Sequence, residues 1–112
     1  MIRGEVWTVA DGPEFAGKPR PAVILQDDVF DATLSVTVCP VTSSDTDARL
    51  VRPVLEASVA NGLQVVSRLM VDKITTVSRA KLRRRIGRLS ADELTRMNRA
   101  VVVFLGLGSV ER

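Results

Sequence analysis

Short apolar runs rich in β-branched residues follow one another along the first two thirds of the chain. They read EVWTV (5–9), AVILQ (22–26), TLSVTVCPVT (33–42), LVRPVLE (50–56), LQVVS (63–67) and LMVDKITTV (69–77). Runs of this kind predict strands, and the dipeptide NG at 61–62 predicts a turn between two of them. Pro40 predicts that the third strand is locally unpaired, at an edge or a bulge. Five or six short strands with loops between them indicate a small barrel.

The hydrophobic pattern changes its period after residue 89. Ser90 and Glu93 have the spacing of a capping box, in which each side chain binds a free backbone N–H at a helix start. Apolar residues then recur at spacings of 3, 4 and 7, namely Leu94, Met97, Val101, Phe104 and Leu105. Gly106 and Gly108 mark the end of this pattern. We therefore predict a helix of roughly 15 residues that packs on the barrel by this apolar face.

A basic segment separates the strands from this helix. The sequence SRAKL (78–82) predicts a short helical turn capped by Ser78. The overlapping run RAKLRRRIGR (79–88) holds six basic residues in ten, and Leu82 and Ile86 interrupt it at helical spacing. We expect one anchored side and one solvated side, and either contact with a nucleic-acid backbone or a role in solubility.

Composition narrows the functional classes. A chain of 112 residues with 46% hydrophobic and 26% charged residues is typical of one folded domain, here 1–112. The absence of histidine excludes a Ser-His-Asp or Cys-His nucleophile and a His-ligated zinc site. The single cysteine, Cys39, excludes an internal disulfide and is predicted to be a small buried hydrophobe. The longest uncharged run, Ala32 to Ser44, is too short to cross a bilayer and no signal-peptide core is present, so we predict a cytoplasmic protein.

Charge is distributed unevenly along the chain. Residues 1–66 contain 5 basic and 9 acidic residues, a balance of −4, whereas residues 67–112 contain 11 basic and 4 acidic residues, a balance of +7. A basic half favours a polyanionic partner, of which nucleic acid is the commonest, over a charged face that serves solubility alone.

Four residues are candidates for chemistry: Arg20, Thr42, Ser43 and Asp72. Arg20 stands between Pro19 and Pro21 at the start of an apolar run, so its backbone is held extended and its guanidinium suits a phosphate. Thr42 and the adjoining serine follow a strand, where hydroxyls donate to phosphate oxygens or cap a turn. Asp72 lies within a largely apolar run and is expected to be functional or ion-paired with Lys73, Arg68 or another basic neighbour.

Taken together, these segments resemble the MazF/PemK family of toxin endoribonucleases. The matching pieces occur in the family's order and cover nearly the whole chain: RGEVW, RPAVIL, VCPVTS, GL at 62–63, MVDKITTV and LRRRIGRLSADEL. The resemblance implies an α+β fold, a small SH3-like β-barrel of five to seven strands closed by a C-terminal helix. It also implies a homodimer that cuts single-stranded RNA at short sequences and that a cognate antitoxin protein blocks.

The resemblance also assigns site residues. It places the catalytic arginine at Arg20, the active-site threonine at Thr42 and a participating aspartate at Asp72. A further family arginine corresponds to Met70, and Arg68 substitutes for it only if the strand bulges. A loop glutamate of one branch corresponds to Glu14 with the spacing one residue off. We expect the RNA-binding residues to be Lys18, Ser43, Arg68 and Lys73.

The implied mechanism is attack of the ribose 2′-OH on the adjacent phosphate, which leaves a 2′,3′-cyclic phosphate and a 5′-OH and requires neither metal nor cofactor. Arg20 is expected to stabilise the charge that grows on the phosphate oxygens. Arginine is a poor base because its pKa is above about 12, so Asp72 is the preferred base or orienting group.

The sequence also bears on two alternative functions. One is a non-catalytic toxin of the same fold that binds DNA gyrase, as in the CcdB branch. That branch relies on a tryptophan-containing C-terminal tail, whereas the one tryptophan here is Trp7 and the chain ends in GLGSVER. The other is an SH3-like module for proline-rich peptides, which need grooves lined by aromatic side chains. With four aromatic residues and no tyrosine, the chain does not favour this module.

Overall fold

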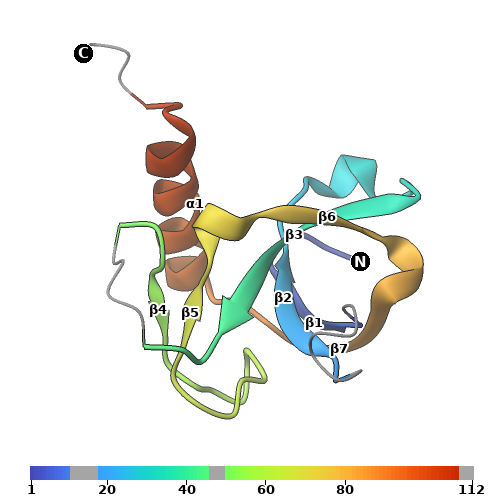
Figure 1. The fold of residues 1–112 in the computed structure, drawn as a ribbon, viewed down its shortest axis with the longest axis horizontal. Coiled ribbons are helices and arrows are strands. Elements are labelled where there is room, and N and C mark those ends of the chain that lie inside the picture. Colours follow the sequence, from blue (N-terminus) through green and yellow to red (C-terminus); the bar gives the residue numbers. More distant parts are fainter. Residues whose placement is uncertain (11–17, 46–49, 109–112) are drawn as a thin grey trace.

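Seven antiparallel strands form one strongly curled sheet in the computed structural model, which describes residues 1–10, 18–45 and 50–108. The strands are β1 (Glu5–Val9), β2 (Arg20–Ile24), β3 (Ser35–Thr42), β4 (Val54–Leu55), β5 (Ser67–Leu69), β6 (Thr75–Ser78) and β7 (Leu82–Arg88). Their order is β4-β5-β3-β2-β1-β7, and β6 pairs with β3 beside this path. Among the described residues there is one α-helix, α1 (Ala91–Leu105), which stands against the β4–β5 end of the sheet (Figure 1). The predicted small barrel with a C-terminal helix is confirmed.

Strand β3 is the centre of the sheet. It pairs with β2 on one side, with Ala22 opposite Pro40. On its other side it pairs first with β6, along residues 35–38, and then with β5, at residues 41–42. Pro40 lies in the gap between these two pairings, where its missing N–H costs no ladder hydrogen bond. The predicted local break is therefore confirmed, and it lies at an irregularity in the pairing of a central strand and not at a sheet edge.

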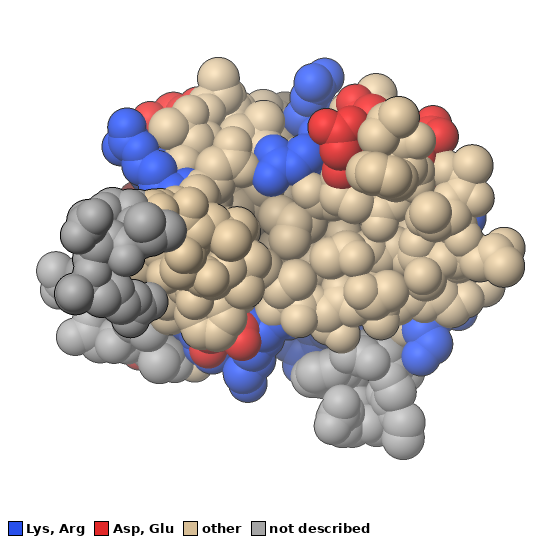
Figure 2. Space-filling model, turned by 90° about the horizontal axis from the view of Figure 1, so that it is seen from above, with Lys and Arg blue, Asp and Glu red and all other residues tan. Residues whose placement is uncertain are grey.

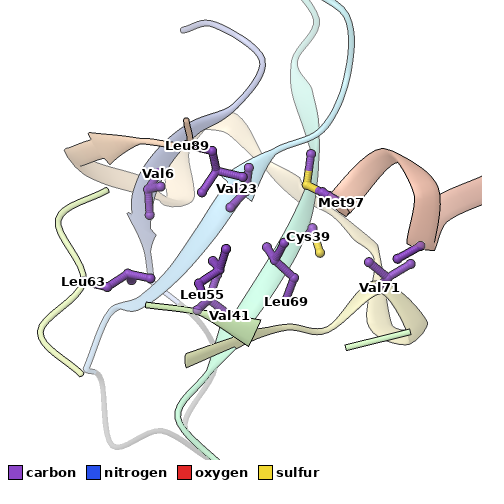
Figure 3. Packing of buried hydrophobic residues seen from close by; sticks show 11 residues of the cluster. Val6, Val23, Cys39, Val41, Leu55, Leu63, Leu69, Val71, Leu89 and Met97 are labelled. Atoms are coloured by element: carbon purple, nitrogen blue, oxygen red, sulfur yellow. The ribbon is translucent and has the colours of Figure 1, made fainter. Parts of the chain in front are cut away.

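Two hydrophobic clusters use opposite faces of the same strands. Val23 and Cys39 belong to the larger cluster, which Met97 and Ala100 of α1 close from the helix side (Figure 3). Ala22, Ile24 and neighbouring valines of β3 form the smaller cluster on the other face. Because side chains alternate across a strand, burial on both faces explains why β2 is an unbroken apolar run instead of an alternating one.

The helix begins and ends as predicted. Ser90 Oγ accepts a hydrogen bond from the Glu93 N–H, and a Glu93 carboxylate oxygen accepts one from the Ser90 N–H, which completes the capping box. Gly106 ends the helix with φ +69°, in the left-handed region that favours glycine. The apolar face is only partly buried, however. Met97 is fully buried, whereas Phe104 and Leu105 are about half exposed, so the prediction that they pack in the core is wrong.

Several predicted strands are shorter than their apolar runs. The run at 50–56 contributes only Val54–Leu55, and the run at 63–67 contributes one residue, Ser67, to β5. The dipeptide at 61–62 is not a hairpin turn, because eleven residues, 56–66, separate β4 from β5. Their loop is built around a fully buried Asn61 instead of a tight turn.

The run at 69–77 is also interrupted. β5 ends at Leu69, a 3₁₀ turn η3 (Val71–Lys73) follows, and β6 starts at Thr75. Asp72 therefore lies on a 3₁₀ turn and not on a strand, which corrects the prediction.

The basic segment combines a turn and a strand. The predicted turn is confirmed as η4 (Arg79–Lys81), with Ser78 Oγ accepting from the Ala80 N–H. A further 3₁₀ turn, η2 (Asp28–Phe30), follows β2. Leu82 and Ile86 lie on β7, so the helical interpretation of their spacing is wrong. No described helix is long and apolar enough to span a membrane.

Candidate functional site

Arg20 and Thr42 meet at the adjoining ends of two paired strands. Ala22 faces Pro40 across β2 and β3, and extending this register by two residues places Arg20, the first residue of β2, opposite Thr42, the last of β3. On its other side Arg20 faces Val9 of β1. The strand therefore starts at Arg20, two residues earlier than predicted; Arg20 is paired with β1, and the pairing of β2 with β3 begins at Ala22. This placement fixes its backbone more firmly than a proline loop alone.

A cavity of about 250 Å³ opens at these strand ends. Arg20, Thr42 and Ser43 contribute polar groups to its lining, and Val41, Leu63 and Ile86 contribute apolar ones. Its remaining lining residues are Thr8, Pro21, Gly62, Gln64, Val65 and Ser67. Convergent polar groups over an apolar surface are typical of a binding site for a small polar group. The predicted residues Arg20, Thr42 and Ser43 therefore lie together in one pocket.

The Thr42 hydroxyl is oriented by a local turn. Its Oγ1 accepts a hydrogen bond of 3.1 Å from the Ser44 N–H. Since a hydroxyl has one donor and two acceptor lone pairs, this bond leaves the hydroxyl proton to donate. The expected turn bond of Thr42 is therefore confirmed, and donation of its hydroxyl proton to a phosphate oxygen stays a prediction.

Arg68 is the neighbour of Thr42 across the next pairing. Thr42 faces Arg68 of β5, and β3 and β5 pair there without a register shift. The Arg68 guanidinium is largely buried and lies 3.0 Å from an Asp45 carboxylate oxygen. Its Nη1 is buried with no hydrogen-bond partner among the described residues. Arg68 therefore brings positive charge to the strand end next to Thr42. Because β5 has no bulge there, the condition under which Arg68 was expected to replace the arginine absent at Met70 is not met.

Asp72 lies outside this pocket. Its two carboxylate oxygens each accept a hydrogen bond of 3.0 Å from the Arg52 guanidinium, from Nε and Nη2. This paired hydrogen bond is the largest influence that holds the pKa of Asp72 below its usual value, and it also raises the pKa of Arg52. The expected ion pair of Asp72 is therefore made with Arg52, and not with Lys73 or Arg68.

The other predicted residues divide between two places. Lys18 is exposed two residues before Arg20 and does not line the pocket. Lys73 is exposed on η3 next to Asp72 and does not line the pocket. Glu14 falls outside the described residues. Cys39 is fully buried, and burial followed by the charge of Asp72 raises the pKa of its thiol to about 12, which suits a core residue and not a nucleophile.

Sequence reasoning missed the residues that extend the pocket. A second cavity of about 720 Å³ adjoins it and is lined by Gln64 and Arg84, among others. Arg84 belongs to the basic run that pointed to nucleic acid, but the run alone does not say which arginine faces a groove. Gln64 carries no motif, and only its place in the loop between β4 and β5 reveals it.

One face of the molecule is largely uncharged. In Figure 2, most Lys, Arg, Asp and Glu side chains lie toward the margins of the view and the middle carries none. At the end of α1, a group of large apolar side chains is at least 39% exposed: Val102, Val103, Phe104, Leu105 and, just beyond the helix, Leu107. Patches of this kind usually mark protein contacts.

Comparison with known proteins shows the family to which the chain belongs. Residues 2–105 match a family described as PemK-like, MazF-like toxin of type II toxin-antitoxin system. The chain is 53% identical to a probable endoribonuclease MazF of Mycolicibacterium smegmatis, over 96% of this chain and 98% of that protein. It is 36% identical to endoribonuclease MazF9 of Mycobacterium tuberculosis, over 97% and 99% of the two chains.

A solved structure has a similar fold. It is described as an endoribonuclease in complex with its cognate antitoxin from Mycobacterial species, and it superposes with a TM-score of 0.79. The alignment covers 97% of this chain and 98% of that chain at 18% sequence identity, a likeness of fold.

Proposed function

The chain belongs to the MazF-like endoribonuclease toxins of type II toxin–antitoxin systems, and from this premise we propose that it cuts single-stranded RNA at a short sequence with Arg20 and Thr42 at the reacting phosphate. The matches favour this activity over the gyrase-binding alternative. The observation that carries the proposal is that Arg20 and Thr42, at the adjoining ends of the paired strands β2 and β3, line one pocket.

The chemistry is an internal transfer at phosphorus. The ribose 2′-oxygen forms a bond to phosphorus and loses its proton, while the bond from phosphorus to the 5′-oxygen breaks and that oxygen gains a proton. The products are a 2′,3′-cyclic phosphate and a 5′-OH, so no water and no metal ion enters the balance. Negative charge increases on the phosphate oxygens during the attack, where the Arg20 fork and the Thr42 hydroxyl donate hydrogen bonds.

We do not propose Asp72 as the base that takes the 2′-OH proton, although the family resemblance gives it a part in the reaction. Arg52 engages both of its carboxylate oxygens, and the pair lies away from the pocket. In our proposal, Asp72 holds the Arg52 guanidinium in position. The 2′-OH proton passes to solvent, which reaches the pocket past the exposed Arg20 and Ser43.

Protein partners complete the proposal. We propose a cytoplasmic homodimer that a cognate antitoxin protein neutralises, as the similar fold solved with its antitoxin suggests. The exposed apolar side chains at the end of α1 support a protein contact at that face.

The test is RNA cleavage without metal. The purified protein is incubated with a long RNA in EDTA, and the new ends are mapped and chemically typed. We expect cuts at one short motif with 5′-OH and 2′,3′-cyclic phosphate ends. Intact RNA, or cleavage only after a divalent cation is added, would contradict the proposal.

A further inference from the structure

A larger groove continues from the Arg20–Thr42 pocket across the neighbouring surface. Its volume is about 720 Å³, and it shares five lining residues with the pocket: Thr8, Gly62, Leu63, Gln64 and Ile86. Beyond this common wall it is lined by Ala57, Ser58, Val59 and Arg84. Since the two cavities share a wall, a chain whose phosphate lies between Arg20 and Thr42 can place its next nucleotide in the groove. A volume of this size is ample for a ligand of that kind.

One wall of the groove is a preorganised loop, residues 56–66. Its anchor is the fully buried Asn61, whose amide oxygen accepts from the N–H groups of Ser58 and Leu63. The Asn61 Nδ2 donates to the Glu56 carbonyl and to a Glu93 carboxylate oxygen of the capping box. Hydrogen bonds of Asn61 therefore connect residues within the loop and connect the loop to the start of α1. The buried amide oxygen and nitrogen of Asn61 both have partners.

The same loop packs closely on β7. Gly62 has φ +74°, and a Cβ built there would lie 2.1 Å from the Ile86 carbonyl oxygen. A Cβ at Gly87 would lie 2.3 Å from the Asn61 carbonyl carbon. Two glycines thus let the loop and β7 touch through their backbones, so the two walls of the groove are fixed relative to each other.

Gln64 presents its amide from this fixed wall. It lines both cavities and is exposed, and no described residue forms a hydrogen bond with its side chain. A glutamine amide offers both donors and an acceptor, which is the pattern that reads base edges. Val59, which is fully exposed, and Ile86 give apolar contact for the base on the same surface.

Arg84 differs from its two neighbours in the basic run. Arg85 forms an ion pair of 2.7 Å with Glu5, and the Arg83 Nη1 donates to the Ala80 carbonyl. Among the described residues, the Arg84 guanidinium has neither an ion-pair partner nor a hydrogen-bond acceptor. Of the three arginines, Arg84 is the one that lines the groove. Its backbone is held in place by Thr8, whose Oγ1 accepts from the Arg84 N–H.

From these contacts we propose that the groove binds the nucleotide next to the scissile phosphate, with Gln64 reading its base and Arg84 binding its phosphate. This inference rests on the proposed RNA cleavage and deepens it, because it makes Gln64 a specificity-determining residue for one position of the motif. Splayed bases of single strands are read in this way, by hydrogen bonds to their edges.

Gln64→Ala and Gln64→Glu test the base contact. All 5′-OH ends produced from a long RNA are sequenced for the wild type, both variants and Val66→Ala, a control in the same loop whose side chain lines neither cavity. We expect the preference at one motif position adjacent to the cut to relax in Gln64→Ala and to change in Gln64→Glu. An unchanged motif in both variants overturns the inference, whereas a wild type that cuts no RNA overturns the proposed function instead.

A Gln64 variant that folds but no longer cuts is tested by binding. Motif oligonucleotides with 2′-deoxyribose at the cut site and each base in turn at the neighbouring position compete for the protein. If the variant ranks the four bases as the wild type does, Gln64 does not read that base and the inference fails.

Arg84→Ala tests the phosphate contact, with Arg83→Ala as its matched control. We expect Arg84→Ala to reduce the slope of log affinity against log salt for the 2′-deoxy oligonucleotide by about 0.7, the share of one single-strand phosphate, and to leave the motif unchanged. Equal losses in both variants would mean a diffuse basic surface and would overturn the assignment to Arg84.

Discussion

Arg20, the first residue of β2, and Thr42, the last residue of β3, line the same pocket and bring it a guanidinium and a hydroxyl. The Arg20 backbone is paired with Val9 of β1, and the Thr42 hydroxyl closes a turn with Ser44. Fixed donors stabilise developing charge without reorganising during the reaction. This relationship is the basis of the proposed catalysis.

Arg20→Ala removes the cationic donor from the pocket. We expect the single-turnover rate of RNA cleavage to fall by about 10²–10³ with the fold unchanged, because transition-state charge loses one preorganised partner. Arg20→Lys should recover only part of the rate, since an ammonium lacks the planar fork. Arg83→Ala is the control, because this exposed arginine lines neither cavity, and an equal loss in that variant would refute a special role for Arg20.

Thr42→Val keeps the shape of the side chain and removes its hydroxyl. We expect the cleavage rate to fall by about 10² and the free energy of unfolding to fall by about 1 kcal/mol, because the Ser44 N–H loses its acceptor. Thr42→Ser keeps the hydroxyl and should retain most of the rate. If Thr42→Ser is as slow as Thr42→Val while both fold, the hydroxyl is not the group that matters.

Asp72→Asn weakens the ion pair with Arg52. We expect the free energy of unfolding near neutral pH to fall by about 1–3 kcal/mol, because the largely buried Arg52 side chain loses its charged partner, and the cleavage rate of the folded protein to change little. A large loss of rate with unchanged stability would instead make Asp72 the base in the reaction.

The loss of stability in Asp72→Asn should depend on pH. The pKa of Asp72 is lowered in the folded state, chiefly by the hydrogen bonds from Arg52, so the ionised carboxylate stabilises the fold above its unfolded pKa. The stability difference between wild type and Asp72→Asn should be full above about pH 5 and decline below about pH 4. Urea unfolding at a series of pH values measures it, and a difference that grows on acidification would contradict the sign.

Gly62→Ala tests the rigid wall of the groove. The positive φ and the 2.1 Å approach of a Cβ to the Ile86 carbonyl oxygen require the loop or β7 to move. We expect the free energy of unfolding to fall by about 2–4 kcal/mol in urea denaturation. Gly108→Ala is the control, because its Cβ would meet only a Val102 methyl at 3.3 Å. Similar stabilities for the two variants would show that the loop yields easily.

Cys39 should be chemically silent in the folded protein. Burial and then the charge of Asp72 raise its pKa to about 12, so the thiolate fraction at pH 8 is lower than that of a free cysteine by roughly 10³. Alkylation by iodoacetamide at pH 8 should be slow until denaturant is added. Rapid labelling of the native protein would contradict this environment.

Local signals predicted the parts of the fold that local chemistry determines. The capping box of Ser90 and Glu93, the stop at Gly106 and the turn capped by Ser78 each involve residues close in sequence. The break at Pro40 was also predictable, since proline lacks the donor wherever it lies. The position of Pro40 in the centre of the sheet was not, because strand order depends on pairings between distant segments.

The predictions that were wrong have two causes. Either the sequence pattern is compatible with both a helix and a strand, or the residue's partner lies far away in the sequence. A spacing of four, as between Leu82 and Ile86, suits a helix face, but four is even and therefore also suits one face of a strand. Asp72 finds Arg52, twenty residues earlier, only once the fold brings them together. Asn61 resembled a turn residue, although its amide is a buried anchor.

The most direct test of the account is an RNA oligonucleotide that contains the cut motif with a single 2′-deoxyribose at the nucleotide whose 2′-OH attacks. The cleavage rate is measured in EDTA beside that of the unmodified strand. We predict no cleavage at that bond and unimpaired binding, because the attacking nucleophile is missing while Arg20 and Thr42 still hold the phosphate. Cleavage of both strands at the same rate would contradict 2′-OH attack at the Arg20–Thr42 pocket.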